Sequence, residues 1–226
     1  GLYFHHDIEA MVRVAAAQSV LTHSHPTGIA SSVAAAAPVA WAAQGHGLSG
    51  MLEFTRACVA RLSPEVLAEL GATPELIERY GAREMLAALE KTGDAFGKEA
   101  DDVCELLGGG WIGEESVAAA LWCVQKAGGD FRESVLRGAN SSGDSDSIAC
   151  IAGSIAGAMT GVGGLPEEWV TGVEKAEVLR GLSGALHEAS KARTTFSPLD
   201  ERRLAASFDV FGTSADERPA QARLRF

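Results

Sequence analysis

Helical spacing governs almost the whole of this sequence. Apolar residues recur three and four positions apart in one segment after another, as Ile8, Met11, Val12 and Ala16 do near the start. No stretch alternates apolar and polar residues as a half-buried strand would, and no Asn-Gly turn joins two such stretches. The sequence therefore predicts an all-α protein, built of many helices of moderate length that are joined by short loops.

The helices can be placed from this spacing and from capping residues. Ser63 before Pro64 and Thr73 before Pro74 are each typical of a helix N-terminus, and Pro38 is expected to interrupt the segment in which it lies. The other expected helices span residues 7–21, 26–43, 50–62, 84–91, 100–107, 114–126, 130–137, 147–160, 166–182 and 184–191. We expect one helical domain over residues 1–193 and a loosely ordered tail over residues 194–226.

The composition of the chain argues against nucleic-acid binding and against a membrane-spanning protein. The 226 residues are 46% hydrophobic, which is enough for one sizeable core, and the formal charge is −11. So acidic a chain is not expected to bind nucleic acid or an anionic membrane in general, because it would repel phosphate. The longest apolar run, residues 148–162, is shorter than the roughly 20 residues of a membrane span. The four cysteines lie in apolar helical patterns, which predicts core positions and a reducing, cytoplasmic setting.

Two carboxylates and a hydroxyl stand together just before that apolar run. Asp144 and Asp146 are separated by one residue, and Ser147 follows directly. Three oxygen donors this close, in a loop that enters a helix, can converge on one hard cation such as Mg²⁺ or Mn²⁺. Helix capping is the other interpretation, because Asp and Ser are favoured at N-caps and negative charge is stabilised in the first helical turn. The residues by themselves leave both interpretations open.

Small residues recur at every fourth position of the same run, at Ala149, Gly153, Gly157 and Gly161. On a helix they form one smooth stripe along a single face. Glycine in a helix interior costs up to about 1 kcal/mol relative to alanine, so the stripe predicts that another backbone approaches closely. We expect this helix to be central and among the most buried, with its N-terminus at the floor of a cleft.

The stretch "GDSDSIACIAGSIAGAMTGVGGLPEEW" resembles the C-terminal signature of the ADP-ribosylglycohydrolase family. That signature is a glycine, an Asp-x-Asp-Thr or Asp-x-Asp-Ser group, a helix of small residues, a proline and a tryptophan. The matching residues here are Gly143, Asp144, Asp146, Ser147, Pro166 and Trp169. The segment "AAAQSVLTHSHP" resembles the family's Thr-His segment, and "GGGWIGEESVAAALWC" resembles its glycine-rich turn and following helix. The resemblance covers residues 1–173 and implies the compact orthogonal bundle of helices of that family.

The resemblance implies a metal centre. Asp144, Asp146 and Ser147 would be ligands in a site of two Mg²⁺ ions, with Mn²⁺ as the alternative cation. The family's second group of ligands, a Thr-Asp-Asp-Thr segment, and its early catalytic acid are not found here, and "EADDV" at Asp101 and Asp102 lies in a different place and context. We expect the catalytic acid or base upstream of Gly1. On that expectation the sequence is the C-terminal two-thirds of a family member, its N-terminal portion is missing, and the chain is inactive alone.

The resemblance also implies residues that contact the substrate. His23 would contact the phosphate or ribose of ADP-ribose, and Trp111 would line the pocket near the sugar or the adenine. Gly110 and Gly143 would contribute to substrate binding as well. Without the resemblance, His23 is interpreted as a side chain that bonds a neighbouring carbonyl, and Trp111 as a core aromatic.

The implied reaction is hydrolysis of the N- or O-glycosidic bond between ADP-ribose and a protein side chain or small leaving group. Such a bond breaks through an oxocarbenium-like state, and two close metals can orient ribose hydroxyls and lower the pKa of a water molecule. The partner would be an ADP-ribosylated protein or a small molecule that contains ADP-ribose. Two alternatives stay open. One is a catalytically inactive ADP-ribose-binding or structural, crystallin-like member of the family. The other is an unrelated helical metal-binding protein that uses "HSH" and the pair His5 and His6.

Overall fold

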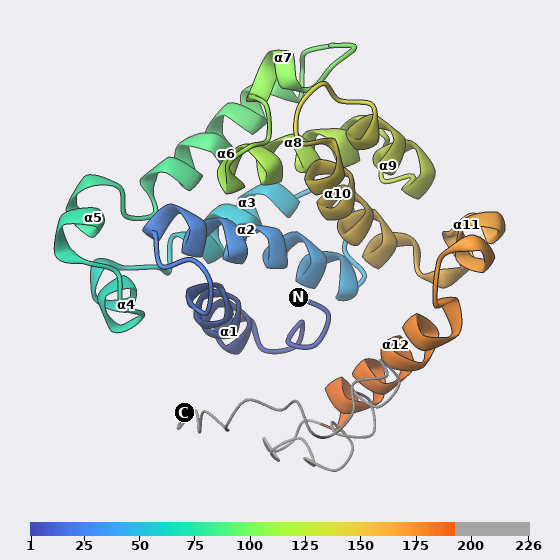
Figure 1. The fold of residues 1–226 in the computed structure, drawn as a ribbon, viewed down its shortest axis with the longest axis horizontal. Coiled ribbons are helices and arrows are strands. Elements are labelled where there is room, and N and C mark those ends of the chain that lie inside the picture. Colours follow the sequence, from blue (N-terminus) through green and yellow to red (C-terminus); the bar gives the residue numbers. More distant parts are fainter. Residues whose placement is uncertain (193–226) are drawn as a thin grey trace, which may run out of the picture. The chain divides into compact units, whose positions relative to one another are not determined.

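The computed structural model describes residues 1–192, which form helices joined by short loops (Figure 1). The helices are α1 (Ile8–Val20), α2 (Pro26–Ala43), α3 (Met51–Val59), α4 (Pro64–Glu69), α5 (Pro74–Arg79), α6 (Arg83–Ala95), α7 (Cys104–Leu107), α8 (Gly113–Lys126), α9 (Phe131–Ala139), α10 (Ser145–Thr160), α11 (Glu167–Gly172) and α12 (Ala176–Lys191), with a 3₁₀ turn η1 (Val162–Gly164) after α10. Within residues 1–192 there is no strand, so the all-α prediction is confirmed. The expected boundary after residue 193 and the expected tail lie outside the described residues.

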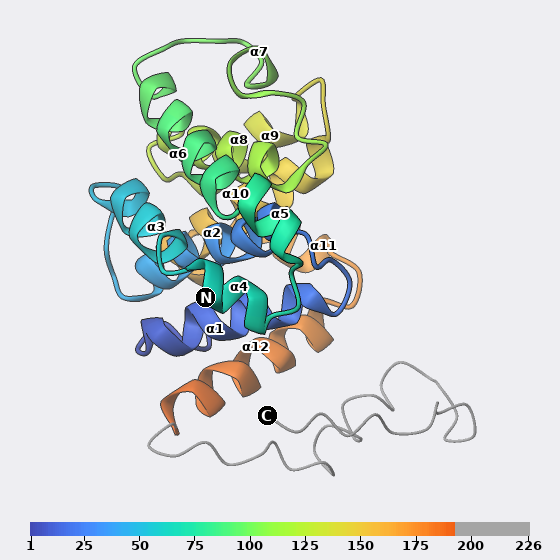
Figure 2. The same cartoon turned by 90° about the vertical axis from the view of Figure 1, so that its left-hand side faces the viewer.

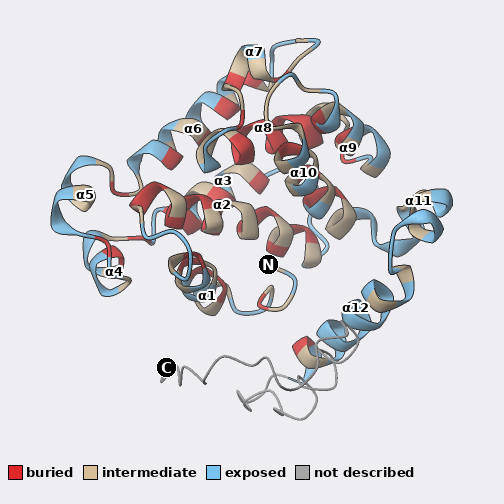
Figure 3. Ribbon diagram, in the orientation of Figure 1, coloured by how far each residue is buried: buried red, intermediate tan, exposed pale blue. Residues whose placement is uncertain are grey.

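The core is centred on α2 and α8. Helix α2 packs against α1, α3, α6, α8 and α10, and α8 also contacts α6, α9 and α10. Figure 3 shows that buried positions are most continuous in these two helices. Small buried residues of α2, such as Ala30, Ala34 and Ala37, let neighbouring helices lie close to its backbone. Pro38 does not interrupt α2 as expected, because the helix continues through it to Ala43.

The predicted capping residues begin their helices. The Ser63 hydroxyl accepts a hydrogen bond from the Val66 N–H (3.4 Å), and the Thr73 hydroxyl accepts one from the Leu76 N–H (3.4 Å). In both cases a proline follows at the first helical position, where its missing N–H is not needed. The starts of α4 and α5 are thus set locally by sequence.

Two helices differ from the expectation. The break expected at residue 183 lies earlier, because Val173 is extended and Lys175 has a φ of 59°. Helix α12 therefore runs through both Gly181 and Gly184, at whose Cβ positions no atom lies within 4 Å. Helix α7 is shorter than expected and begins at Cys104.

The small-residue stripe of α10 faces α9, as a close-approach surface should. A Cβ added at Gly138 of α9 would lie 2.8 Å from the backbone N and Cα of Ala149. Further along, a Cβ at Gly153 would lie 3.1 Å from Val135 and one at Gly157 would lie 3.5 Å from Phe131. The backbone-to-backbone contact is thus confined to the first turns of α10. The expectation that α10 is among the most buried helices is wrong, since α2 and α8 bury far more of their residues.

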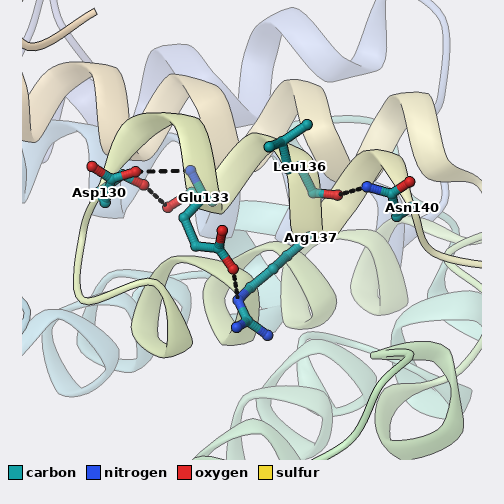
Figure 4. Close-up of polar contacts among 6 residues, drawn as sticks. Asp130, Glu133, Leu136, Arg137 and Asn140 are labelled. Atoms are coloured by element: carbon teal, nitrogen blue, oxygen red, sulfur yellow. Dashed lines mark hydrogen bonds and ion pairs between the residues drawn. The ribbon is translucent and has the colours of Figure 1, made fainter.

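Helix α9 leads directly into the loop that carries the acid cluster (Figure 4). The Asp130 carboxylate accepts a hydrogen bond from the Glu133 N–H (2.8 Å) and so caps the helix. Glu133 pairs with Arg137 one turn later (2.9 Å). At the other end, the Asn140 side-chain N–H donates to the Leu136 carbonyl (2.8 Å) and closes the last turn. These local bonds fix where the loop of residues 140–144 begins.

The four cysteines differ in exposure. Cys58 and Cys123 are buried as predicted, Cys104 is half-buried, and the core prediction is wrong for Cys150, which is exposed. Burial raises the pKa of the Cys58 thiol to about 11 and that of the Cys123 thiol to about 12. All four thiols are free. Within the described residues no helix is both long enough and apolar enough to cross a bilayer.

Thiol labelling should report these differences. With Ellman's reagent at pH 8 we expect Cys150 to react first, Cys104 more slowly, and Cys58 and Cys123 only after unfolding, because a thiol with so high a pKa forms little thiolate. Absorbance at 412 nm counts the thiols that react before and after denaturant is added. Cys150→Ser should remove the fast phase, and a fast phase of unchanged amplitude in that variant would contradict the assignment.

Candidate functional site

The two carboxylates of the acid cluster lie at the start of α10. Asp144 is the N-cap residue, but its side chain makes no capping hydrogen bond, and Asp146 lies in the first turn. The pKa of Asp146 lies below its usual value, first because of a hydrogen bond with Asp144 and then because of the N–H groups of Asp146 and Ser147. Two neighbouring ionised carboxylates repel each other unless a proton or a cation lies between them. Capping therefore accounts in part for Asp146 and not for Asp144, whereas a cation would engage both.

A glycine turn lies directly against this pair. The Asp144 N–H donates to the Gly109 carbonyl (2.7 Å), and Figures 1 and 2 show the loop before α10 beside the segment that follows α7. A Cβ at Gly143 would lie 1.9 Å from the Gly109 oxygen, so a side chain has no room there. Gly110 is buried, has a φ of +73°, and would place a Cβ 3.5 Å from that of Asp144. Gly110, Gly143 and Asp144 are thus brought together.

Helix α8 holds the turn from the other side. The Glu115 carboxylate accepts a hydrogen bond from the Gly110 N–H (3.1 Å), and the Ser116 hydroxyl donates to the Gly110 carbonyl (2.5 Å). Sequence analysis missed both residues as parts of the site. Their position in the first turn of the helix after a glycine turn was the available signal, because side chains there point back toward the preceding loop.

Trp111 projects from the turn into solvent. Its side chain is 74% exposed, and a Cβ at Gly109 would lie 2.7 Å from its indole nitrogen. The interpretation of Trp111 as a core aromatic is therefore wrong. A large exposed indole beside a buried glycine turn offers a flat apolar surface to a sugar or a base.

His23 lies between α1 and α2 and is exposed. Its Nδ1 is 2.9 Å from the Thr22 hydroxyl, so the ring bonds a side chain and not a neighbouring carbonyl. His23 also lies beside Ser19 and Gly28, and none of these residues belongs to the acid pair. The contacts of the structure therefore do not join His23 to the acid pair. Helix α2, which His23 precedes, approaches the first residue of α8 at Ser31, whose side chain lies beside Gly113.

Asp102 is tied to the acid loop, although its sequence context gave no reason to expect it. One carboxylate oxygen accepts a hydrogen bond from the Cys104 N–H (2.9 Å), and the other accepts one from the Ser142 N–H (3.0 Å). The first bond explains why α7 begins at Cys104. The second reaches a residue 40 positions away, two residues before Asp144.

A family comparison covers most of the chain. The model of the ADP-ribosylglycohydrolase family matches residues 1–195. This range includes the acid pair, the glycine turn and the Thr-His segment. It also extends past residue 173, where the resemblance to the family signature was expected to end.

Curated relatives carry names that fit this match. ADP-ribosylhydrolase ARH3 of Bos taurus is 27% identical over 195 residues, which are 80% of this chain and 52% of that protein. An uncharacterised protein of Archaeoglobus fulgidus is 28% identical over 190 residues, which are 83% of this chain and 54% of that protein. ADP-ribosylarginine hydrolase Tri1 of Pseudomonas putida is 38% identical over 74 residues, which are 33% of this chain and 20% of that protein. Against ARH3 and the archaeal protein, the chain spans about half the length of the relative.

Proposed function

This chain belongs to the ADP-ribosylglycohydrolase family, and from that membership we propose that it takes part in releasing ADP-ribose from its conjugates. The bond broken is the N- or O-glycosidic bond between the ribose and a protein side chain or a small leaving group. The relatives' names, an ADP-ribosylhydrolase and an ADP-ribosylarginine hydrolase, support an ADP-ribosylated protein as substrate. They do not favour the alternative of an inactive or structural family member.

The observation that carries the proposal is the position of Asp144 and Asp146 at the start of α10, where the Asp144 N–H is bonded to the Gly109 carbonyl of the glycine turn. An acidic chain of charge −11 has to bind a diphosphate against its own field. A cation held by the two carboxylates would reverse the sign of the charge locally. The turn beside it adds a flexible, close-lying backbone and the exposed Trp111.

The donor set fits a hard cation in part. Asp144, Asp146 and the Ser147 hydroxyl supply the oxygen chemistry that Mg²⁺ and Mn²⁺ prefer, and Mg²⁺ usually keeps several waters. Within residues 1–192, however, no group of three or more His, Cys, Asp or Glu side chains is placed to hold an ion together. We therefore propose that these three residues form one side of a two-Mg²⁺ site. We also propose that these 226 residues do not hydrolyse ADP-ribose conjugates by themselves, because one side of a metal site does not hold both ions.

The residues of this chain would bind and orient the ligand. When bound, the ions supply Lewis acidity toward ribose hydroxyls and water. Asp144 and Asp146 would hold the ions in place and would not act as the nucleophile. Trp111 would pack against the sugar or the adenine, and His23 would contact the phosphate or ribose. Gly110 and Gly143 would let the ligand approach the backbone. A cytoplasmic location also stays a prediction.

Removal of the metal tests this function. In isothermal titration calorimetry we expect the chain to bind ADP-ribose at least about tenfold more tightly in Mg²⁺ than in EDTA, which is about 1.4 kcal/mol. AMP, which lacks the second ribose, should show a smaller difference. Release of ADP-ribose from an ADP-ribosylated protein by this chain alone should stay at background in both Mg²⁺ and EDTA. Equal affinities for ADP-ribose in Mg²⁺ and in EDTA, or no binding in either, would contradict the proposal.

A further inference from the structure

We propose that Asp102 is a positioning residue, which holds the loop of residues 141–144 so that Asp144 and Asp146 are presented to a cation. The proposal rests on the function proposed above. Asp102 does not touch the acid pair, and it acts through the backbone of Ser142.

The geometry of Asp102 is that of a bridge between two segments. Both of its oxygens are used, one on the Cys104 N–H (2.9 Å) and one on the Ser142 N–H (3.0 Å). The first bond anchors the carboxylate at the start of α7. The second attaches the acid loop to that anchor, across 40 residues of sequence. Without the bond from Ser142 to Asp102, the exposed Ser142 would no longer be connected to the start of α7.

Two other bonds complete the support of the loop. The Ser141 hydroxyl donates to the Gly138 carbonyl (2.8 Å), and the Asp144 N–H donates to the Gly109 carbonyl (2.7 Å). Ser142 lies between Ser141 and Asp144, and its N–H donates to the charged carboxylate of Asp102. Bonds from an N–H to an ionised carboxylate are stronger than those to a neutral carbonyl.

The carboxylate is suited to this place by its charge. Partial burial acts to raise the pKa of Asp102, but hydrogen bonds from Ser142 and Cys104 outweigh that effect and hold the pKa below its usual value. An asparagine could accept from one of the two N–H groups. Its own NH₂ group would then face the other N–H, so one of the two bonds would be replaced by a donor–donor contact.

Such a support matters for metal binding because ligands that are already in place lose less freedom when an ion binds. Residues that orient metal ligands typically change metal affinity or activity by about 10- to 100-fold when they are replaced. Asp102 would orient Asp144 and Asp146 in this way, since it bonds Ser142, which lies two residues before Asp144.

The test compares Asp102→Asn with Asp101→Asn, which changes the exposed neighbouring carboxylate in the same way. Mn²⁺ binding to the full chain is measured from the electron paramagnetic resonance signal of free Mn²⁺. We expect the Mn²⁺ Kd to rise at least about tenfold in Asp102→Asn and to stay within about twofold in Asp101→Asn. Ser142→Ala keeps the backbone N–H and should give a smaller rise than Asp102→Asn.

Amide hydrogen exchange without metal gives a second readout that does not depend on the proposed function. Exchange over residues 141–147 should become at least about tenfold faster in Asp102→Asn, while the exchange of α2 and α8 stays that of the wild type. If wild-type protein binds Mn²⁺ and Asp102→Asn binds it equally well, the inference is overturned. If the wild type binds no Mn²⁺, the proposed metal site fails, and unchanged loop exchange in Asp102→Asn would overturn the positioning role as well.

Discussion

Asp146→Ala is expected to abolish the Mg²⁺-dependent part of ADP-ribose binding. Asp146 and Asp144 are the two carboxylates at the start of α10, and removing one leaves a single anionic donor and a hydroxyl for the cation. We expect the Mn²⁺ Kd to rise at least about 100-fold, more than for any residue that only orients a ligand. The affinity for ADP-ribose in Mg²⁺ should fall to its value in EDTA.

The matched control is Glu84→Ala, which removes an exposed acid from the first turn of α6. Both variants lose a favourable charge at a helix N-terminus, so both should melt close to the wild type. Only Asp146→Ala should lose the metal effect. An Asp146→Ala protein whose ADP-ribose affinity still rises in Mg²⁺ would show that the cation is held elsewhere.

Gly138→Ala is expected to be the most destabilising alanine substitution on α9. The added methyl would lie 2.8 Å from the N and Cα atoms of Ala149, and backbone atoms of α10 cannot move aside as a side chain can. The helices would have to separate, and overpacking of this kind costs about 3 kcal/mol at the upper end of its usual range. Urea unfolding followed by circular dichroism measures the change in the free energy of unfolding.

Gly184→Ala provides the opposite case within the same fold. Gly184 lies inside α12, and no atom lies within 4 Å of the position its Cβ would take. Alanine should therefore stabilise the helix by up to about 1 kcal/mol through propensity alone. If both variants unfold within about 0.5 kcal/mol of the wild type, α9 and α10 do not approach each other as described.

Local signals predicted the helices well. Spacing and caps placed α2, α4 and α5 at the observed starts, because the residues that decide them lie within one turn of each other. The prediction failed where a single backbone angle decides, as at Lys175, whose positive φ ends one segment and lets α12 begin. The break expected at residue 183, between Gly181 and Gly184, is absent for another reason. Glycine lowers helix stability only slightly, so α12 continues through both residues.

The sequence indicated the chemical groups of the candidate site, but not the residues that hold them in place. The spacing of Asp144 and Asp146 indicated a pair of carboxylates at the start of a helix, and both residues lie at the start of α10. The partner of Asp102 lies 40 residues away, and no local pattern connects them. Exposure is equally hard to read from sequence, as Trp111 shows, because a tryptophan beside glycines fits a core as well as a surface.

The close contact between the backbones of Gly143 and Gly109 decides which residues of this site can change during evolution. The acid loop and the glycine turn meet through backbone atoms, so their mutual placement does not depend on which side chain the turn displays. Trp111 stands outside that contact and faces solvent. A lineage could therefore exchange the residue at this position, and with it the ligand surface, while inheriting the acid loop unaltered. Gly143 itself cannot be replaced in this way, because any side chain at that position would separate the acid loop from the glycine turn.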